Sequence, residues 1–90
     1  MAKIVTIEVK FFASLRERIA LGSLTSNAAS MPELRQDLAS QLSTQAYYVL
    51  CGDGVRVAIN QVFTTDDWQQ SKAAIPAGAE VAFLPPVTGG

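Results

Sequence analysis

The last ten residues restrict the fold more than any other stretch of this chain. Val81 to Leu84 form a short apolar run of the kind found in buried strands. Pro85 and Pro86 follow directly, and because proline has no backbone N–H, a strand inside a sheet cannot continue through them. Residues 85–90 can reach about 20 Å when extended, at about 3.3–3.6 Å per residue. The sequence therefore predicts a buried strand that ends at residue 84 and carries a narrow C-terminal arm.

The N-terminal region predicts a second strand and a short helix. Residues 3–12 alternate, with Val5, Ile7, Val9 and Phe11 on one face, which is typical of a strand with one side in the core. Residues 13–21 change to helical spacing, and Gly22 is placed to end that helix. Residues 23–29 are small and polar, and we expect a weak edge strand or a loop there.

The main helix has the clearest start signal. Ser30 and Glu33 fit a capping box with a proline in the first turn, and leucines then recur every four residues. These features predict a helix over residues 31–43. The apolar run that follows, residues 46–50, is compatible with either a helical turn or a strand.

The second half of the chain reads as turns and strands. A Gly-Asp-Gly turn at 52–54 precedes a strand over 55–60, and a turn at 60–61 leads into 62–64. A short helical turn is expected at 66–68, a loop at 75–78 and the last strand at 80–84. No repeat or linker interrupts the chain, so residues 1–90 form one domain, with 85–90 as its arm. The simplest arrangement is an α+β fold in which one main helix packs on a mixed, mostly antiparallel sheet, with the first and last strands adjacent in its middle. That is a β-grasp, or ubiquitin-like, fold.

The composition excludes several functional classes. Of the 90 residues 49% are hydrophobic and 17% charged, enough for a packed core. The net charge is −1, which argues against nucleic-acid binding. No apolar run approaches the roughly 18 residues that cross a bilayer, and no signal peptide is visible, so we expect a cytoplasmic protein without membrane contact. The chain has no histidine, the commonest general base and metal ligand, and we expect no metal and no cofactor bound by this chain.

Four motifs give the chain a family resemblance. They are the C-terminal GAEVAFLPPVTGG, the FFASLRE segment at 11–17, the VAINQ segment at 57–61 and the PELR segment at 32–35. Together they cover nearly the full length. The chain resembles the small, sulfur-carrying subunit of molybdopterin synthase. It departs from that pattern at Leu84, where the family often has an aromatic residue.

The resemblance implies a function for the arm. The Gly90 carboxylate would be adenylated by an ATP-dependent enzyme related to ubiquitin-activating enzymes and then converted to a thiocarboxylate. The tail would enter the large synthase subunit and donate its sulfur to cyclic pyranopterin monophosphate, building the dithiolene that holds molybdenum. Two small and two large subunits would form a heterotetramer with the large subunits at its centre. The small subunit would not be an enzyme on its own, because the catalytic residues are expected on the large subunit.

The residues of the arm make this chemistry intelligible. A terminal carboxylate is ionised at neutral pH and is a poor electrophile, so it must be activated before sulfur is attached. The chain has no phosphate-binding G-x-x-x-x-G-K-[ST] loop, so activation requires a partner that uses ATP. Gly89 and Gly90 have no Cβ and can pass through a narrow channel. Val87 and Thr88 can pair with the channel wall, and we expect all residues from Pro85 to Gly89, namely Pro85, Pro86, Val87, Thr88 and Gly89, to thread the partner's active site.

Residues near the base of the arm are candidates for a partner interface. Phe83 is expected in the core, in register with Val81, and Leu84 is expected to be exposed beside the arm. Leu84, Phe83 and Arg56 are taken together as the candidate interface. Trp68 fits either a small satellite core or an interface.

Other polar residues have simpler interpretations. Cys51 has no neighbouring cation in the sequence to lower its pKa, which favours a structural thiol over a sulfur-handling one. Asp66 and Asp67 form an acidic pair that helix capping explains. Three other functions stay open: a sulfur carrier for thiazole or tRNA thiolation, a ubiquitin-like modifier conjugated to lysines, and an interaction module that does not use its terminus.

Overall fold

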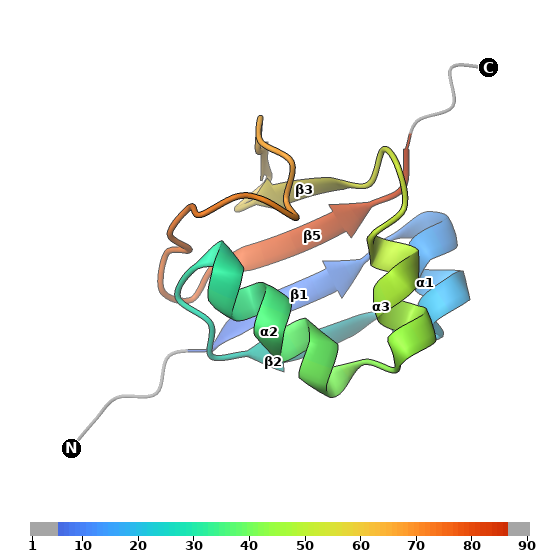
Figure 1. The fold of residues 1–90 in the computed structure, drawn as a ribbon. Coiled ribbons are helices and arrows are strands. Elements are labelled where there is room, and N and C mark those ends of the chain that lie inside the picture. Colours follow the sequence, from blue (N-terminus) through green and yellow to red (C-terminus); the bar gives the residue numbers. More distant parts are fainter. Residues whose placement is uncertain (1–5, 87–90) are drawn as a thin grey trace.

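The structure is a computed structural model that describes residues 6–86 of the chain. Five strands form one sheet in the order β2-β1-β5-β3-β4, and the described residues contain three helices. In Figure 1, α2 and α3 lie across one face of the sheet and α1 lies beside α3. The elements are β1 (Ile7–Phe11), α1 (Ala13–Ile19), β2 (Ser23–Ser26), α2 (Met31–Gln41), α3 (Thr44–Leu50), β3 (Arg56–Ile59), β4 (Val62–Phe63) and β5 (Glu80–Leu84).

The sheet confirms the predicted β-grasp arrangement. β5 is the central strand, and it pairs in parallel with β1 and antiparallel with β3. β1 and β5 are aligned so that Val9 lies beside Val81 and Phe11 beside Phe83, and all four side chains are at most 1% exposed. The alternation of both strands puts these four side chains under the helices. The first and last strands are therefore neighbours inside the sheet, as the sequence predicts.

α2 begins with the predicted cap. The Ser30 hydroxyl accepts a hydrogen bond from the Glu33 amide at 3.4 Å, and the Glu33 carboxylate accepts one from the Ala29 amide at 3.1 Å. Leu34 and Leu38 are fully buried against the sheet. The helix ends at Gln41, two residues before the predicted end, because the backbone becomes extended at the next residue. This residue still packs its partly buried side chain on the core.

The end of α1 differs from the prediction. Ala20 ends the helix in the left-handed conformation, with φ 63°, and its amide donates to the Arg16 carbonyl at 2.9 Å. Gly22 was predicted to have this role, but it lies two residues further on. Its carbonyl instead accepts from the Phe11 amide at 3.0 Å, which opens the pairing of β2 with β1. The weak segment after it is a four-residue edge strand rather than a loop.

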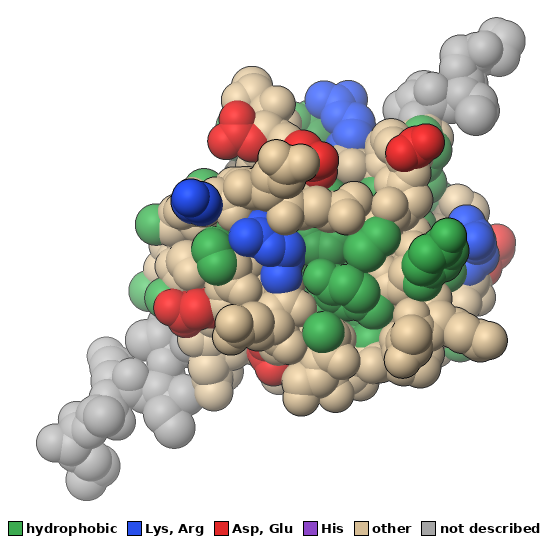
Figure 2. Space-filling view, viewed as in Figure 1, with side chains coloured by type: hydrophobic (Ala, Val, Ile, Leu, Met, Phe, Trp, Pro, Cys, Tyr) green, Lys and Arg blue, Asp and Glu red, His purple; other side chains and the backbone are tan. Residues whose placement is uncertain are grey.

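The ambiguous segment at 46–50 is helical. Ser43 caps α3 through its hydroxyl, which accepts from the Ala46 amide at 3.0 Å. Ala46 and Leu50 face the core, whereas Tyr48 on the same helix is 78% exposed. Figure 2 shows hydrophobic side chains gathered around α3 and between α3 and α2 on this side of the molecule. The sheet therefore carries a second packed helix where the sequence predicted one main helix.

Arg35 of α2 holds the long connection between β4 and β5 in place. Its guanidinium donates from Nη1 to the Trp68 carbonyl at 2.8 Å and to the Ser71 carbonyl at 2.7 Å. The Asp67 carboxylate accepts from the Gln69 amide at 3.0 Å, so it caps the turn as predicted. The two hydrogen bonds of Arg35 have a charged donor, and such bonds are stronger than those between neutral groups. Arg35 thus joins a segment with little regular structure to the main helix.

Candidate functional site

The residues predicted to carry the chemistry lie mostly outside the described part of the chain. Val87, Thr88, Gly89 and Gly90 are not among the described residues, and the structure follows the arm as far as Pro86. The described part of the site is the segment from Leu84 to Pro86, which we call the arm base.

The arm base leaves the best-anchored strand of the sheet. β5 is paired on both sides, and its last paired residue is Leu84, opposite Arg56 of β3. The Phe83 carbonyl also accepts from the Phe12 amide at 3.1 Å. The strand ends where the prolines begin, as their missing N–H groups predict. Figure 1 shows the chain leaving the sheet at this end of β5.

Phe83 supports the arm base from inside the core. Its ring is 0% exposed and lies 5.8 Å from the Phe11 ring and 5.0 Å from the Trp68 ring, centroid to centroid. Trp68 is also buried, and its indole N–H donates to the Leu50 carbonyl at 3.2 Å. The expectation of Phe83 as an interface residue needs correction, because its side chain points to the helix side of the sheet. Trp68 likewise belongs to the core and not to a surface.

The opposite face of the sheet presents a small apolar surface beside the arm base. Register places Leu84 beside Arg56 and Ala58 beside Phe63 on this face. Arg56 lies over the Phe63 ring, 4.2 Å from its centroid, and Phe63 is 46% exposed. Leu84 is half-buried rather than fully exposed. We call Arg56, Phe63 and Leu84 the arm-base face.

Phe63 was not among the sequence-predicted site residues. β4 has only two residues, Val62 and Phe63, which is too short for alternation to show which side chain faces which side. The turn before it has positive φ at both Asn60 (50°) and Gln61 (69°), which fixes the antiparallel register of β4 on β3. That turn, which the Asn60-Gln61 pair signals in the sequence, pairs Phe63 with Ala58 and so brings its ring under Arg56.

An ion-paired region adjoins the arm-base face on the same side of the sheet. Lys10 lies 3.1 Å from the Glu80 carboxylate and 3.6 Å from that of Glu8. The hydrogen bond with Glu80 and the charges of both carboxylates raise the pKa of Lys10 above its ordinary value. Because the pair is exposed, water and salt screen it, and it adds little stability. This side of the sheet therefore carries Arg56 between two apolar side chains near the arm and ion pairs further along β1 and β5.

Cys51 has the properties of a structural thiol. It follows α3 as its C-terminal cap and is half-buried. Burial raises the pKa of the Cys51 thiol, which disfavours the reactive thiolate. Among residues 6–86 no three His, Cys, Asp or Glu side chains come together as a metal site.

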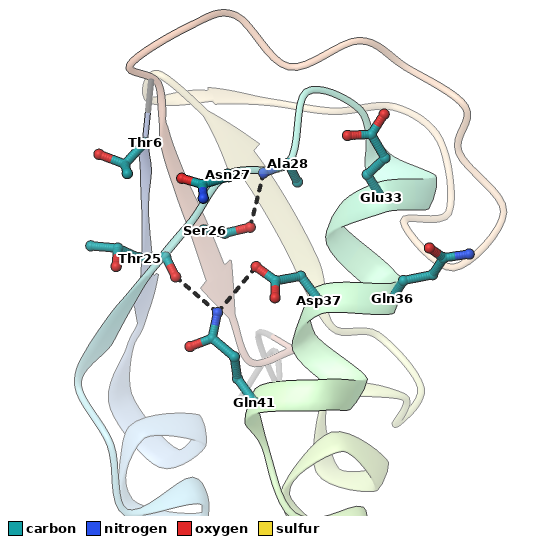
Figure 3. A pocket seen from close by; sticks show the side chains of 9 residues that line it. All are labelled: Thr6, Thr25, Ser26, Asn27, Ala28, Glu33, Gln36, Asp37 and Gln41. Atoms are coloured by element: carbon teal, nitrogen blue, oxygen red, sulfur yellow. Dashed lines mark hydrogen bonds between the residues drawn. The ribbon is translucent and has the colours of Figure 1, made fainter. Parts of the chain in front are cut away.

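A large polar hollow lies far from the arm. It has a volume of about 630 Å³ and opens between β2 and α2, near the start of β1, whereas the arm leaves from the opposite end of the parallel strand β5. Figure 3 shows its polar lining and how Gln41 bridges the two elements. The Gln41 amide donates to the Thr25 carbonyl at 2.9 Å and to the Asp37 carboxylate at 3.1 Å. These hydrogen bonds join β2, the edge strand, to α2, the main helix.

Comparison with known proteins decides the family. The ThiS family model matches residues 9–90, from β1 to the last residue. The chain belongs to the ThiS family. It is also 38% identical over 87 residues to the molybdopterin synthase sulfur carrier subunit of Escherichia coli (strain K12), covering 93% of this chain and 99% of that protein. The predicted resemblance to that subunit is confirmed.

Two solved structures share the fold of this chain. A protein complex of subunits 1 and 2 of molybdopterin-converting factor from Helicobacter pylori contains a chain 25% identical, with a TM-score of 0.65 over 94% of this chain and 99% of that one. The small archaeal modifier protein 1 of Methanosarcina acetivorans is 22% identical, with a TM-score of 0.73 over 99% of this chain and 100% of that one. The second likeness shows the fold alone. Within residues 6–86, no helix has the length and hydropathy of a membrane span.

Proposed function

We propose that this chain is the sulfur carrier subunit of a molybdopterin synthase. One observation carries the proposal: the sequence is 38% identical to a subunit of that name along almost the whole of both chains. The structure adds a physical reason. The strand that holds the arm is the central, doubly paired strand of the sheet, so the arm has a rigid foundation.

The proposed chemistry uses the terminal carboxylate of Gly90. An activating enzyme joins this carboxylate to the AMP portion of ATP and releases pyrophosphate. A sulfur nucleophile then displaces AMP, which leaves a thiocarboxylate on Gly90. In the large subunit, the thiocarboxylate sulfur forms a bond to carbon of cyclic pyranopterin monophosphate, and water then cleaves the C–S bond to Gly90, which supplies the oxygen of the regenerated carboxylate. This chain supplies the arm and its foundation, while ATP and the catalytic residues belong to its partners.

The arm-base face is the proposed contact surface for those partners. Its Phe63 ring and half-buried Leu84 offer apolar area, and Arg56 is held over the ring. Aromatic and arginine side chains are enriched at interface hot spots. Because this face adjoins the arm base, a partner that binds it can receive the tail at the same time. The Helicobacter pylori complex supports a large-subunit partner, with which we propose a heterotetramer of two small and two large subunits.

A ubiquitin-like modifier is the second candidate function. The likeness to an archaeal small modifier protein, with a TM-score of 0.73, shows that the same fold occurs in such proteins. A modifier would be joined through Gly90 to lysines of other proteins, and a carrier would not. The sequence identity of 38% to the synthase subunit favours the carrier.

A copurification experiment separates these functions. Tagged chain is expressed in its native cell, and the proteins bound to it are identified with and without an alanine added after Gly90. A synthase subunit retains a large synthase subunit as its main partner, and the added alanine abolishes molybdopterin formation in the reconstituted pair. Capture of thiazole synthase, or isopeptide bonds from Gly90 to lysines, would contradict the proposal. Retention of molybdopterin formation by the extended chain would do so as well.

A further inference from the structure

The turn between α3 and β3 approaches the arm base closely at Gly54. Gly54 in this turn has φ +80°, and a Cβ placed on it would lie 2.7 Å from Cβ of Pro86 and 3.4 Å from its Cγ. Real Cβ atoms are essentially never found closer than 3.0 Å to a heavy atom outside their own residue and its two chain neighbours. In Figure 1 this loop rises beside the place where the chain leaves β5. The proline ring therefore rests directly on the glycine backbone.

This contact lies where the sheet can no longer hold the chain. Pairing ends at Leu84, and neither Pro85 nor Pro86 has an N–H with which to bond to a neighbouring strand. Beyond Leu84, packing of the two prolines replaces strand pairing in fixing the direction of the chain. The two prolines line a hollow of about 400 Å³ between α1, α3 and the turn, with side chains such as Leu15 and Val55 on its walls. Gly54 closes the turn against Pro86.

We propose that Gly54 is a positioning residue that sets the direction in which the arm leaves the domain, an inference that rests on the proposed carrier function. Any side chain at this position would have to push Pro86 away by about 0.7 Å to bring 2.7 Å up to an ordinary contact of 3.4 Å. A shift at Pro86 changes the point and the direction from which the tail starts toward the partner's active site. A displacement of about 1 Å at a reacting group can lower a rate about 100-fold.

The chain offers a matched control for the test. Gly78 also has positive φ, at +73°, but a Cβ there would meet nothing within 4 Å. Gly54→Ala and Gly78→Ala therefore impose similar backbone strain, and only the first disturbs Pro86. We expect both variants to lower the urea midpoint of unfolding similarly. We expect Gly54→Ala to lower kcat/KM for thiocarboxylate formation by at least about tenfold and Gly78→Ala to change it by less than about twofold.

A double variant tests the contact itself. Pro86→Gly removes Cβ, the atom with which the new side chain would clash at 2.7 Å, together with Cγ, and leaves Cα at 3.7 Å. In the Pro86→Gly background, adding Gly54→Ala is expected to lower kcat/KM no more than Gly78→Ala does. In NMR spectra, nuclear Overhauser contacts between the Gly54 α-protons and the Pro86 ring should be present in the wild type and in Gly78→Ala.

The outcomes separate the two levels of the proposal. If Gly54→Ala and Gly78→Ala lower kcat/KM equally, or if the wild type shows no contact between Gly54 and Pro86, the positioning role is wrong while the carrier function stands. If the wild-type chain receives no sulfur from any activating enzyme of its own cell, the carrier function is wrong. The positioning role then falls with it, even where the contact is seen in the spectra.

Discussion

Replacing Phe83 by leucine tests whether this residue acts from inside the core. The ring is 0% exposed and lies 5.8 Å from Phe11 and 5.0 Å from Trp68, and a leucine in its place would lose both aromatic contacts. Aromatic pairs add about 0.5–1.5 kcal/mol each beyond the area they bury, and the smaller side chain leaves some empty volume. We expect Phe83→Leu to lower the free energy of unfolding by about 1–3 kcal/mol. For a domain of this size, each kcal/mol corresponds to about 4–8 °C in Tm.

The matched control makes the same change on the other side of the sheet. Phe63 is 46% exposed and contacts Arg56 through a cation–π interaction, worth about 0.5–1 kcal/mol at exposed sites. We expect Phe63→Leu to cost about 1 kcal/mol or less in stability. If the arm-base face binds the large subunit, Phe63→Leu should weaken that binding by about 1 kcal/mol or more. Phe83→Leu should leave binding by the folded protein unchanged.

Urea unfolding followed by the fluorescence of Trp68 measures the first effect, since the chain has one tryptophan. Isothermal titration calorimetry with the large subunit measures the second, below the unfolding transition of each variant. If Phe83→Leu changes stability by less than about 0.5 kcal/mol, the core role assigned to this ring is wrong. If Phe83→Leu weakens binding by the folded chain as much as Phe63→Leu does, the separation between core and arm-base face is wrong.

Two further predictions concern residues away from the arm. Arg35→Met should lower stability by about 1.5–3 kcal/mol, because two backbone carbonyls of the 68–71 turn lose a charged donor. Limited proteolysis should then cut first within 64–78, and cleavage unchanged from the wild type would argue against the anchoring role of Arg35. Cys51 should be alkylated by iodoacetamide more slowly in the native chain than in urea at pH 8, because burial raises the pKa of the thiol. Its reaction rate should rise with pH through a higher midpoint in the native state, and equal midpoints would contradict the burial argument.

The strands and the main helix could be predicted because their signals are local. Alternation in β1 placed Ile7, Val9 and Phe11 on one face, and all three are buried. The Ser30 cap fixed the start of α2, and the prolines fixed the end of β5. Each of these depends on residues within a few positions of one another, so a single sequence contains the information.

The remaining features depend on contacts between distant segments. The sequence does not distinguish α3 from a strand, because a short apolar run such as residues 46–50 fits either a buried helix or a buried strand. In the structure the segment is helical, and Ala46 and Leu50 are its buried residues. α1 ends at Ala20, which takes the left-handed conformation, and Gly22 already belongs to the pairing of β2 with β1 through its carbonyl. The contact between Gly54 and Pro86 joins residues 32 positions apart, and its register is set by the whole sheet. Sequence patterns indicate which residues form turns, but not which distant residues those turns contact.

The most direct test of the carrier function is the mass of the chain after activation. Wild-type chain, its native activating enzyme, ATP and a sulfur source are incubated, and the intact protein and its C-terminal peptide are weighed. We predict that one oxygen is replaced by sulfur on the peptide ending at Gly90, that the change requires ATP, and that adding the large subunit with its pterin substrate reverses it. An unchanged C-terminal peptide would contradict the account. So would sulfur gained as an addition on the peptide containing Cys51, because the carrier would then be a thiol and not the arm.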